Sequence, residues 1–550
     1  MHEVDTLTEM LTLRAQSEPD ARPLIFPDWR EVAPTLAELD AAARLVARDM
    51  RNRIPRGSRA LLVYPTGPEF VAAFFGCLYE GVIPVPSPPP LHGATAERFA
   101  AIVADCAPEL VLTVSEWQPL LAASGLAVFA TDDPAEDEYS HLPASYIPVE
   151  VRPSDIAYLQ YTSGTTGSPR GVVHTHASVL ANLRLSSADH ALTPDDRLVG
   201  WLPLFHDLGV VSQVLQPLFD GFEAVLTQPQ HFVADPAGWL RLVSERAATI
   251  IALPEFGYEM LLRRIPIEQR GDLRLDSLRI ARIAAEALDP VKMTGFVAGF
   301  ADAGLRAGVL NTGYGLAEAV AHVCIAPLGV EPVVLHADRK ALAGGELRPG
   351  TEDTIALVSS GRPGPGVSVM IVELGTVNPV ADGRIGEILL NGSSVTGRYW
   401  TGPRPGVGVD IVRWLPTGDL GCLIDGELFV LGRCADLLVL ESGWHLPADL
   451  ERTAAKAHPA IRSHACAAFT VDGRTVVVAE TSFATAEGAV VRAVWQAVAA
   501  THGVALADVH LVPRGTVPVT TSGKLRRNRC REIWLQTFEN RTRGAQEVSR

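Results

Sequence analysis

The sequence lacks the segments that would place the protein in a membrane or export it. No uninterrupted apolar run approaches the roughly 20 residues that a membrane-spanning helix needs. The opening MHEVDTLTEMLTLRAQSEPD carries acidic and polar residues where a secretion signal needs a basic start and an apolar stretch. These absences predict a cytoplasmic protein that is not an integral membrane protein.

Paired cysteines and an excess of positive charge are also missing. The seven cysteines are isolated, with no CxxC pair and no histidine-rich spacing of the kind that binds zinc, so reduced thiols are expected. Lys and Arg number 47 against 63 Asp and Glu, a formal net charge of -16. This balance argues against general binding to nucleic acid or anionic membrane, so an anionic ligand should meet a local positive site.

The sequence does have enough apolar residues for a large core. Of its 550 residues, 47% are apolar, which predicts more than one domain. Short apolar runs at 59–65, 110–114, 248–254 and 384–392 are bounded by Gly, Pro or Asp and predict buried strands. Helical patterns such as 68–81 lie between runs of this kind. The alternation predicts an α/β fold, with a large N-terminal region of mainly parallel sheets and flanking helices.

Three features divide the chain further. PVPSPPP (84–90) is too rich in proline for a helix or a central strand, which predicts a loop. The polar and Gly-rich stretch 332–353 interrupts the strand pattern and predicts an insertion. After GELFVLGR (426–433) the pattern changes to a smaller α+β region. We therefore expect an N-terminal domain over 1–433 and a small C-terminal domain over 434–550, joined by a hinge.

The segment YTSGTTGSPRG (161–171) gives the strongest indication of chemistry. Its glycines let backbone N–H groups approach phosphate oxygens, its hydroxyls add donors, and Arg170 keeps its charge at any working pH. The GxxxxGK[ST] spacing of a Walker loop is absent. These features predict a polyphosphate-binding loop, and on the residues alone a flexible surface turn is the alternative.

This loop and four further segments resemble the adenylate-forming superfamily, which includes acyl-CoA synthetases, luciferases and the adenylation domains of peptide synthetases. NTGYGLAEAV (311–320) resembles the nucleotide and metal motif, and WLPTGDLG (414–421) resembles the ribose motif. GRCADLLVLESG (432–443) is similar to the hinge, and TTSGKLRRNRC (520–530) to the motif of the catalytic lysine. The resemblance spans most of the chain and implies an enzyme that activates a carboxylic acid with ATP and Mg²⁺.

The resemblance also implies a role for each matching residue. Lys524 would bridge the attacking carboxylate and the α-phosphate, although a solvated lysine is the alternative. Glu318 would hold Mg²⁺, because a hard cation prefers carboxylate oxygen, and Tyr314 would lie against adenine. Asp419 would bind the ribose hydroxyls beside Arg433, with a turn residue as the alternative. The other implied nucleotide contacts are Thr162, Ser163, Gly164, Thr165, Thr166, Gly167, Arg170, Ala285, Glu286, Gly313 and Gly315.

Within the superfamily, the segment WLPLFHDLGVVSQVLQPLFDGFEAVL (201–226) is similar to the fatty acyl-AMP ligases in particular. The similarity implies a fatty acid substrate, with His206 catalytic where the acyl carboxylate meets the nucleotide. A buried hydrogen-bonding histidine is the alternative. The candidates for lining the acyl pocket are Phe205, Val210, Val214 and Phe256. Aliphatic and aromatic residues of this kind more often belong to the protein core, which is the alternative.

The stretch 332–353 falls where this ligase family carries an extra segment before its Gly-Arg-Pro motif, here 361–363. In the family the segment packs against the interdomain linkage and is associated with failure to use coenzyme A. The acyl group passes instead to the phosphopantetheine arm of an acyl carrier protein, which suits lipopeptide or polyketide biosynthesis. Arginines beside Lys524 could dock an acidic carrier. The alternatives are an acyl-CoA synthetase and, from another class, a non-catalytic acyl or nucleotide sensor.

Four residues depart from the family pattern. Arg170 replaces a lysine, which changes the reach of the charge, and Ala435 stands where a charged hinge residue is usual. Ala284 and Glu255 stand where these ligases often have Gly and Asn. A carboxylate of Glu255 in the acyl pocket would repel the head group of a plain fatty acid, or favour an amino or hydroxyl group on a modified acid. The sequence leaves both interpretations open.

Overall fold

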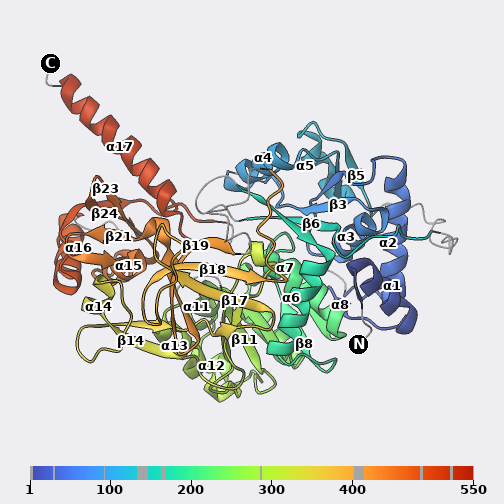
Figure 1. The fold of residues 1–550 in the computed structure, drawn as a ribbon, viewed down its shortest axis with the longest axis horizontal. Helices are drawn as coiled ribbons and strands as arrows, with labels where there is room; N and C mark the ends of the chain where they lie inside the picture. Colours follow the sequence, from blue (N-terminus) through green and yellow to red (C-terminus); the bar gives the residue numbers. More distant parts are fainter. Residues whose placement is uncertain are drawn as a thin grey trace.

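The structure is a computed structural model that describes residues 4–28, 31–91, 93–132, 146–162, 169–284, 288–401, 414–482, 487–520 and 524–548. Helices and strands alternate through its N-terminal part, which confirms the predicted α/β class. In Figure 1 the sheet that contains β3 and β5, with helices α2 to α5, lies at one end of the molecule. Strands β23 and β24 and helix α16 lie at the other end.

The largest sheet has eight strands in the order β1-β9-β8-β10-β11-β12-β13-β16. The run from β1 to β12 is parallel, and β13 and β16 continue it in antiparallel pairing. Apolar residues pack on both faces of this sheet, as expected for parallel strands. The strands are β1 (Leu24–Ile25), β8 (Arg197–Gly200), β9 (Glu223–Leu226), β10 (Ile250–Leu253), β11 (Ile280–Ala284), β12 (Leu310–Tyr314), β13 (Cys324–Ile325) and β16 (Arg362–Pro363).

A second parallel sheet contains the segment that was expected to be a loop. Its order is β3-β2-β4-β5, with β2 at Arg59–Leu62, β3 at Ile83–Pro86, β4 at Leu110–Thr113 and β5 at Val128–Ala130. The expectation of a loop over 84–90 is wrong for residues 84–86, which pair with β2. Because β3 is an edge strand, its prolines do not remove hydrogen bonds that a neighbour on the other side would need.

The helices that pack on these sheets carry clear end signals. In α2 (Leu36–Arg51), Thr35 Oγ1 accepts from Glu38 N at 3.1 Å and the Glu38 carboxylate accepts from Thr35 N at 2.7 Å, which completes a capping box. The predicted helix at 68–81 is confirmed as α3 (Pro68–Glu80). The remaining helices of this part are α1 (Leu7–Ser17), α4 (Ala94–Cys106), α5 (Gln118–Ala122), α6 (His176–Asp189), α7 (Asp207–Val210), α8 (Gln216–Asp220), α9 (Pro229–Ala234), α10 (Pro236–Glu245), α11 (Glu255–Arg264), α12 (Ile267–Arg270) and α13 (Pro290–Gly299).

From β13 to β20 the strands pair antiparallel. A four-stranded sheet contains β17 (Val367–Val372), β18 (Gly386–Gly392), β19 (Leu415–Ile424) and β20 (Glu427–Arg433). The stretch that was expected to be an insertion forms β14 (Val334–Asp338) and α14 (Arg339–Ala343), and β14 pairs with β15 (Thr354–Val358). The hairpin β6 (Ile156–Tyr161) and β7 (Gly171–Thr175) flanks the expected phosphate loop.

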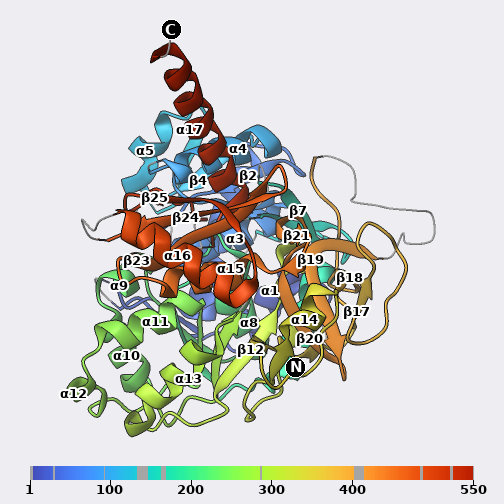
Figure 2. The same ribbon diagram turned by 90° about the vertical axis from the view of Figure 1, so that its left-hand side faces the viewer.

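The C-terminal part has a sheet and apolar clusters of its own. Strand β24 pairs antiparallel with β23 and parallel with β25, and α15 and α16 pack beside them (Figure 2). Helix α17 projects from the body in both views. The elements are β21 (Leu438–Leu440), β22 (Gly443–His445), α15 (Pro447–Lys456), β23 (Ile461–Val471), β24 (Arg474–Thr481), α16 (Glu487–His502), β25 (Leu506–Val512) and α17 (Arg527–Val548).

The cysteines and the longest helices bear on two expectations about the whole chain. All seven cysteines lie within the described residues, and each is a free thiol. Among the described helices, none combines the length and the apolar character that crossing a membrane would require.

Candidate functional site

The expected phosphate loop is held closed at its base. Thr162 N donates to Arg170 O at 3.1 Å, and Arg170 N donates to Thr162 Oγ1 at 3.2 Å. Both residues lie at the ends of β6 and β7, so the hairpin register fixes the two ends of the loop. Seven of the expected nucleotide contacts lie outside the described residues: Ser163, Gly164, Thr165, Thr166, Gly167, Ala285 and Glu286.

Tyr399 connects the cation of this loop to the expected metal ligand. The Arg170 guanidinium carbon lies 3.4 Å from the centroid of the Tyr399 ring, a cation–π contact. On the other side, Tyr399 Oη donates to Glu318 Oε1 at 2.6 Å. Burial and the Glu318 carboxylate both raise the pKa of Tyr399, so its hydroxyl stays a donor. Tyr399 was not predicted from the sequence, because it lies in none of the recognised motifs.

The backbone around Glu318 is tightly folded and strained. Val320 has φ 70° and ψ −66°, and Ala321 N donates to Ala319 O at 3.0 Å, which together define a classic γ-turn. A β-branched residue rarely adopts this conformation, which costs about 1–3 kcal/mol and is concentrated at functional sites. Gly315 is also required, because a Cβ there would lie 1.7 Å from Ala321 O.

A single carboxylate fits one mode of magnesium binding. The described residues contain no group of three His, Cys, Asp or Glu side chains arranged to hold a metal ion. Mg²⁺, however, is commonly bound by one or two carboxylates together with substrate phosphates and water. Glu318 supplies hard carboxylate oxygen, linked through Tyr399 to the loop cation, so the donor set fits Mg²⁺ held largely by a nucleotide.

The expected adenine and ribose residues form one hydrogen-bonded group. Tyr314 Oη donates to Asp419 Oδ2 at 2.5 Å, and Arg433 Nε lies 3.0 Å from Asp419 Oδ1. Asp419 and Arg433 are direct partners in the β19–β20 register. Gly313 precedes Tyr314 on β12, where a Cβ would lie 2.9 Å from Arg282 Nη2. The motifs at 311–320 and 414–421 therefore converge on one place.

His206 and Asp207 form a third polar group at the start of α7. His206 Nδ1 lies 2.5 Å from Asp207 Oδ1, which also accepts from Leu208 N at 2.7 Å. Burial alone would raise the pKa of Asp207, but His206, the Leu208 amide and the positive charge of Lys524 lower it to about 2. The contribution of Lys524 is the smallest of these causes. Asp207 was also missed, although it directly follows His206 in the sequence.

The backbone of Lys524 is bonded to Thr520, four residues earlier. Lys524 N donates to Thr520 Oγ1 at 3.0 Å, and Thr520 N donates to Lys524 O at 2.7 Å. The neighbouring Arg527 is paired internally, with Nε 2.7 Å from Glu451 Oε1 and Nη1 3.1 Å from Asp436 Oδ2. Arg527 is thus committed to the protein and adds little to the basic docking patch that the tail was expected to form.

The residues expected to line an acyl pocket do not form one cluster. Val210 and Val214 are 0% and 1% exposed and belong to the apolar cluster that includes Leu204. Phe256 packs against a different cluster, with its ring centroid 6.1 Å from that of Trp201. Phe205 is half-buried, and its carbonyl accepts from Gln160 Nε2 at 3.0 Å.

Glu255 is not an unpaired carboxylate. Its Oε1 lies 2.8 Å from Lys292 Nζ, and its Oε2 accepts from Asp289 N at 2.8 Å. The charge that could have repelled a fatty acid or attracted an amine is therefore compensated within the protein. The hinge residue Ala435 lies in the single turn Cys434–Asp436, beside the carboxylate that pairs with Arg527. Ala284 ends β11.

The stretch 332–353 contacts the C-terminal part directly. Arg339 Nη1 pairs with Asp449 Oδ2 on α15, and its Nη2 donates to Asp449 Oδ1 at 3.4 Å. Gly443 (φ 108°) packs on α14, where a Cβ would lie 2.4 Å from Ala343 O. These contacts join the stretch to β22 and α15.

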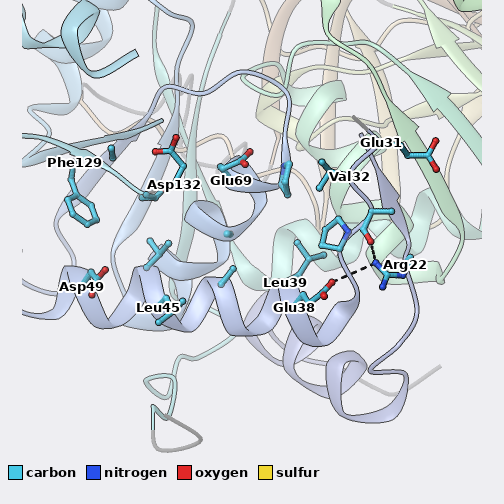
Figure 3. Close-up of a pocket in the computed structure, with 18 residues that line it drawn as sticks. Arg22, Glu31, Val32, Glu38, Leu39, Leu45, Asp49, Glu69, Phe129 and Asp132 are labelled. Carbon is cyan, nitrogen blue, oxygen red and sulfur yellow. Dashed lines mark hydrogen bonds and ion pairs between the residues drawn. The ribbon is translucent and has the colours of Figure 1, made fainter. Parts of the chain in front are cut away.

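A separate cavity of about 530 Å³ lies in the N-terminal part (Figure 3). Its lining comes from α2, the start of α3, β5 and residues 31–34, and it includes Glu69, whose pKa is raised by burial and by the nearby Asp132. None of the residues expected to bind substrate or nucleotide lines it. The candidate site is therefore the group of converging polar residues and not this cavity.

Comparison with known proteins gives consistent matches over the whole chain. The family described as "AMP-binding enzyme" matches residues 11–400, and the family described as "Disco-interacting protein 2-like, AMP domain" matches residues 436–541. The medium-chain-fatty-acid–[acyl-carrier-protein] ligase JamA of Moorena producens is 32% identical over 97% of this chain and 96% of its own.

Solved structures match to a similar extent. A chain from a study of fatty acyl-adenylate ligases from E. coli and L. pneumophila has a TM-score of 0.89 at 30% identity, covering 98% of this chain and 99% of that one. The L. pneumophila fatty acyl-adenylate ligase, in complex with acyl adenylate and pyrophosphate, has a TM-score of 0.76 at 28% identity, covering 97% and 96%.

Proposed function

The chain belongs to the AMP-binding enzyme family, and on this premise we propose that it is a fatty acid–AMP ligase. It joins a fatty carboxylate to the α-phosphate of ATP, which gives acyl-AMP and pyrophosphate. It then transfers the acyl group to the phosphopantetheine thiol of an acyl carrier protein, with AMP as the leaving group. The named activity of JamA and the acyl adenylate bound to the L. pneumophila ligase support these two steps.

The observation that carries the proposal is the pair His206 Nδ1–Asp207 Oδ1 at 2.5 Å, whose carboxylate has a pKa lowered by His206, by the Leu208 amide and, to a smaller extent, by the positive charge of Lys524. Attack of a carboxylate on the α-phosphate brings two anions together and builds negative charge between them. A cation placed there stabilises the transition state more than the separated reactants. His206 meets the carboxylate, and Lys524 bridges it to the phosphate.

The other polar groups hold the nucleotide. Arg170 is exposed and stacked on Tyr399, so its guanidinium is positioned to meet phosphate oxygens. Asp419 accepts hydrogen bonds from the ribose hydroxyls while Arg433 balances its charge. The Tyr314 ring flanks the adenine while its hydroxyl holds Asp419. Mg²⁺ at Glu318 would neutralise part of the charge of the phosphates.

We also propose the domain division and the acyl acceptor. The boundary near Cys434 is supported by the matches to residues 11–400 and 436–541 and by the separate apolar clusters beyond β20. The carrier protein as acceptor is supported by the contacts of 332–353 with the C-terminal domain, which oppose its rotation away from the first half-reaction. A reaction that needs ATP and a carrier protein belongs in the cytoplasm.

The proposal is tested by acid-dependent exchange of labelled pyrophosphate into ATP, with saturated acids of increasing chain length. We expect exchange with fatty acids, followed by thioester formation on a phosphopantetheinylated carrier protein and little on free coenzyme A. Thioester formation with coenzyme A at the rate of exchange would support the acyl-CoA synthetase instead. An absence of exchange with every acid, while ATP still binds, would support the non-catalytic sensor.

A further inference from the structure

Gln213 is a buried polar residue whose amide group is not bonded within the protein. It lies in η2 (Val211–Leu215), a π-helical turn between α7 and α8, and is 1% exposed. In the described part of the chain, neither its Nε2 nor its Oε1 has a hydrogen-bond partner. A buried amide without partners is costly, so such groups usually meet a water or a ligand.

A second glutamine in the same helical segment shows that the protein can bond a buried amide when it serves structure. Gln216 is 2% exposed. Its Nε2 donates to Leu183 O at 3.1 Å, to Ser187 Oγ at 3.0 Å and to Asp220 Oδ2 at 2.6 Å. Its Oε1 has no partner among the described residues, so Gln216 is bonded through nitrogen alone, whereas in Gln213, three residues earlier, neither amide atom is bonded. The two glutamines therefore have different roles.

The backbone makes room for the amide of Gln213. Gly200 ends β8, and a Cβ there would lie 2.0 Å from Gln213 Oε1 and 2.7 Å from its Cδ. Glycine at this position lets the amide lie directly against the strand. The π-helical turn adds a further local irregularity, and such turns occur frequently at functional sites. Two costly local features thus coincide at one unbonded amide.

The position of Gln213 relates it to the acyl group of the proposed reaction. It follows His206 by seven residues in a continuous helical segment, which corresponds to about 10 Å along the axis. It lies three residues after Val210 and precedes Val214, both fully buried and both candidates for contact with the acyl chain. A group bound by Gln213 would therefore lie well away from the carboxylate that meets His206.

We propose that Gln213 is a specificity-determining residue that binds an uncharged hydroxyl or amide group carried by the acyl chain. This inference rests on the proposed function. A primary amide offers both a donor and an acceptor, which matches a hydroxyl or amide partner. A charged substituent is disfavoured, because a neutral amide cannot compensate a buried charge. The preferred substrate is thus a fatty acid that carries a hydroxyl or amide group, and a plain saturated acid is the poorer substrate.

The test is pyrophosphate exchange with matched pairs of acids of equal chain length, one saturated and one with a single hydroxyl remote from the carboxyl group. We expect the wild-type protein to prefer the hydroxylated member by at least about 10-fold in kcat/KM, because an unbonded buried amide penalises the plain acid. Gln213→Leu should remove or reverse this preference. Gln216→Leu, the matched control, should preserve it.

Thermal unfolding separates an unbonded amide from a structural one. Gln213→Leu should leave the Tm unchanged or raise it, since it replaces an unbonded buried amide by an apolar group of similar size. Gln216→Leu should lower it. Gly200→Ala provides a second variant, which keeps the amide but displaces it, and it should also weaken the preference.

Three results would overturn the inference. Equal kcat/KM values for both members of each pair in the wild type would show that the amide meets only trapped water. A Tm of Gln213→Leu lowered as much as that of Gln216→Leu would show an internal partner. A preference for the hydroxylated acid that survives Gln213→Leu would place its origin elsewhere. Absence of exchange with every acid would overturn the proposed function, and this inference with it.

Discussion

Replacing Asp207 by Asn tests whether this carboxylate positions His206 and Lys524 for adenylation. The substitution keeps the size of the side chain and an oxygen that can accept from Leu208 N. It removes the negative charge that lies 2.5 Å from His206 Nδ1 and that attracts Lys524. We therefore expect slower acyl-AMP formation without loss of nucleotide binding, because the adenosine contacts lie on other elements.

The size of the effect follows from the pKa of Asp207. Burial would raise this pKa, yet it falls from the ordinary 3.8 to about 2 through His206, the Leu208 amide and Lys524. A shift of nearly two units corresponds to about 2–3 kcal/mol in favour of the charged form. If all of it were lost from the transition state, exchange would slow by up to about 70-fold. We expect a decrease of about 10- to 70-fold, since part of this energy stabilises the fold.

The assay is acid-dependent pyrophosphate exchange, with Asp220→Asn as the matched control. Asp220 is a second carboxylate of the same helical segment, bonded to Ser187 Oγ at 2.6 Å and to Gln216 Nε2 at 2.6 Å, and its pKa is raised by burial. Asp220→Asn should leave exchange within about 2-fold, as expected for a residue outside the site. Near wild-type exchange in Asp207→Asn, or equal losses in both variants, would refute the reasoning.

The pH dependence has a defined sign. A carboxylate whose pKa is lowered by folding stabilises the folded state at any pH above its unfolded-state pKa. This stability is lost as the pH falls toward the pKa of the folded state. For Asp207 the loss takes place between about pH 4 and about pH 2. Asp207 is charged throughout the range in which exchange is assayed. Protonation of Asp207 should therefore add no step to the pH profile of wild-type exchange near neutral pH, and a step found there belongs to another titrating group.

Three further predictions concern other contacts of the site. Lys524→Ala should slow exchange by about 10²- to 10³-fold, while calorimetry still detects ATP binding. The control is Lys456→Ala, which replaces an exposed lysine. Equal exchange in both variants would show that Lys524 is misassigned. Tyr399→Phe removes the hydrogen bond to Glu318 and should raise the Mg²⁺ concentration for half-maximal exchange by about 10-fold, whereas an unchanged requirement would argue against Glu318 as a ligand. Arg339→Ala breaks the ion pair with Asp449 and should increase thioester formation with free coenzyme A. The control Arg348→Ala breaks only a pair within the stretch 332–353 and should cause no increase. No increase in Arg339→Ala would mean that its ion pair does not restrain the domain.

Much of the fold could be predicted because its signals are local. The run of apolar residues in 68–81 is framed by Pro68 and Gly81, so both ends of α3 are visible in the sequence. The proline-rich strand β3 could not be predicted, since the residues that make it acceptable lie in β2 and in its edge position. The low strand propensity of proline does not reveal that β3 has a neighbouring strand on one edge only.

The candidate site was predicted where a recognised motif carries it and missed where a contact between distant segments creates it. Tyr314, Asp419 and Arg433 belong to motifs, and the structure brings them within hydrogen-bonding distance. Tyr399 reaches Glu318 only because residue 399 bridges to Val172 on β7. Gln213 was hidden for another reason: its significance lies in an absence of partners, which only a folded environment can reveal.

The distribution of charge explains how a chain with a net charge of -16 can hold a triphosphate and a fatty carboxylate. Arg433 is balanced by Asp419, and Arg527 by Glu451 and Asp436, so these cations add little net attraction. Attraction for phosphate therefore depends on cations that are not neutralised in this way, chiefly Arg170 on its aromatic support. Because the field of exposed charges decays over about 8 Å at physiological salt, the distant acidic surface hardly opposes them. Binding thus depends on a few well-placed cations, and the overall acidity of the chain carries little weight at the site.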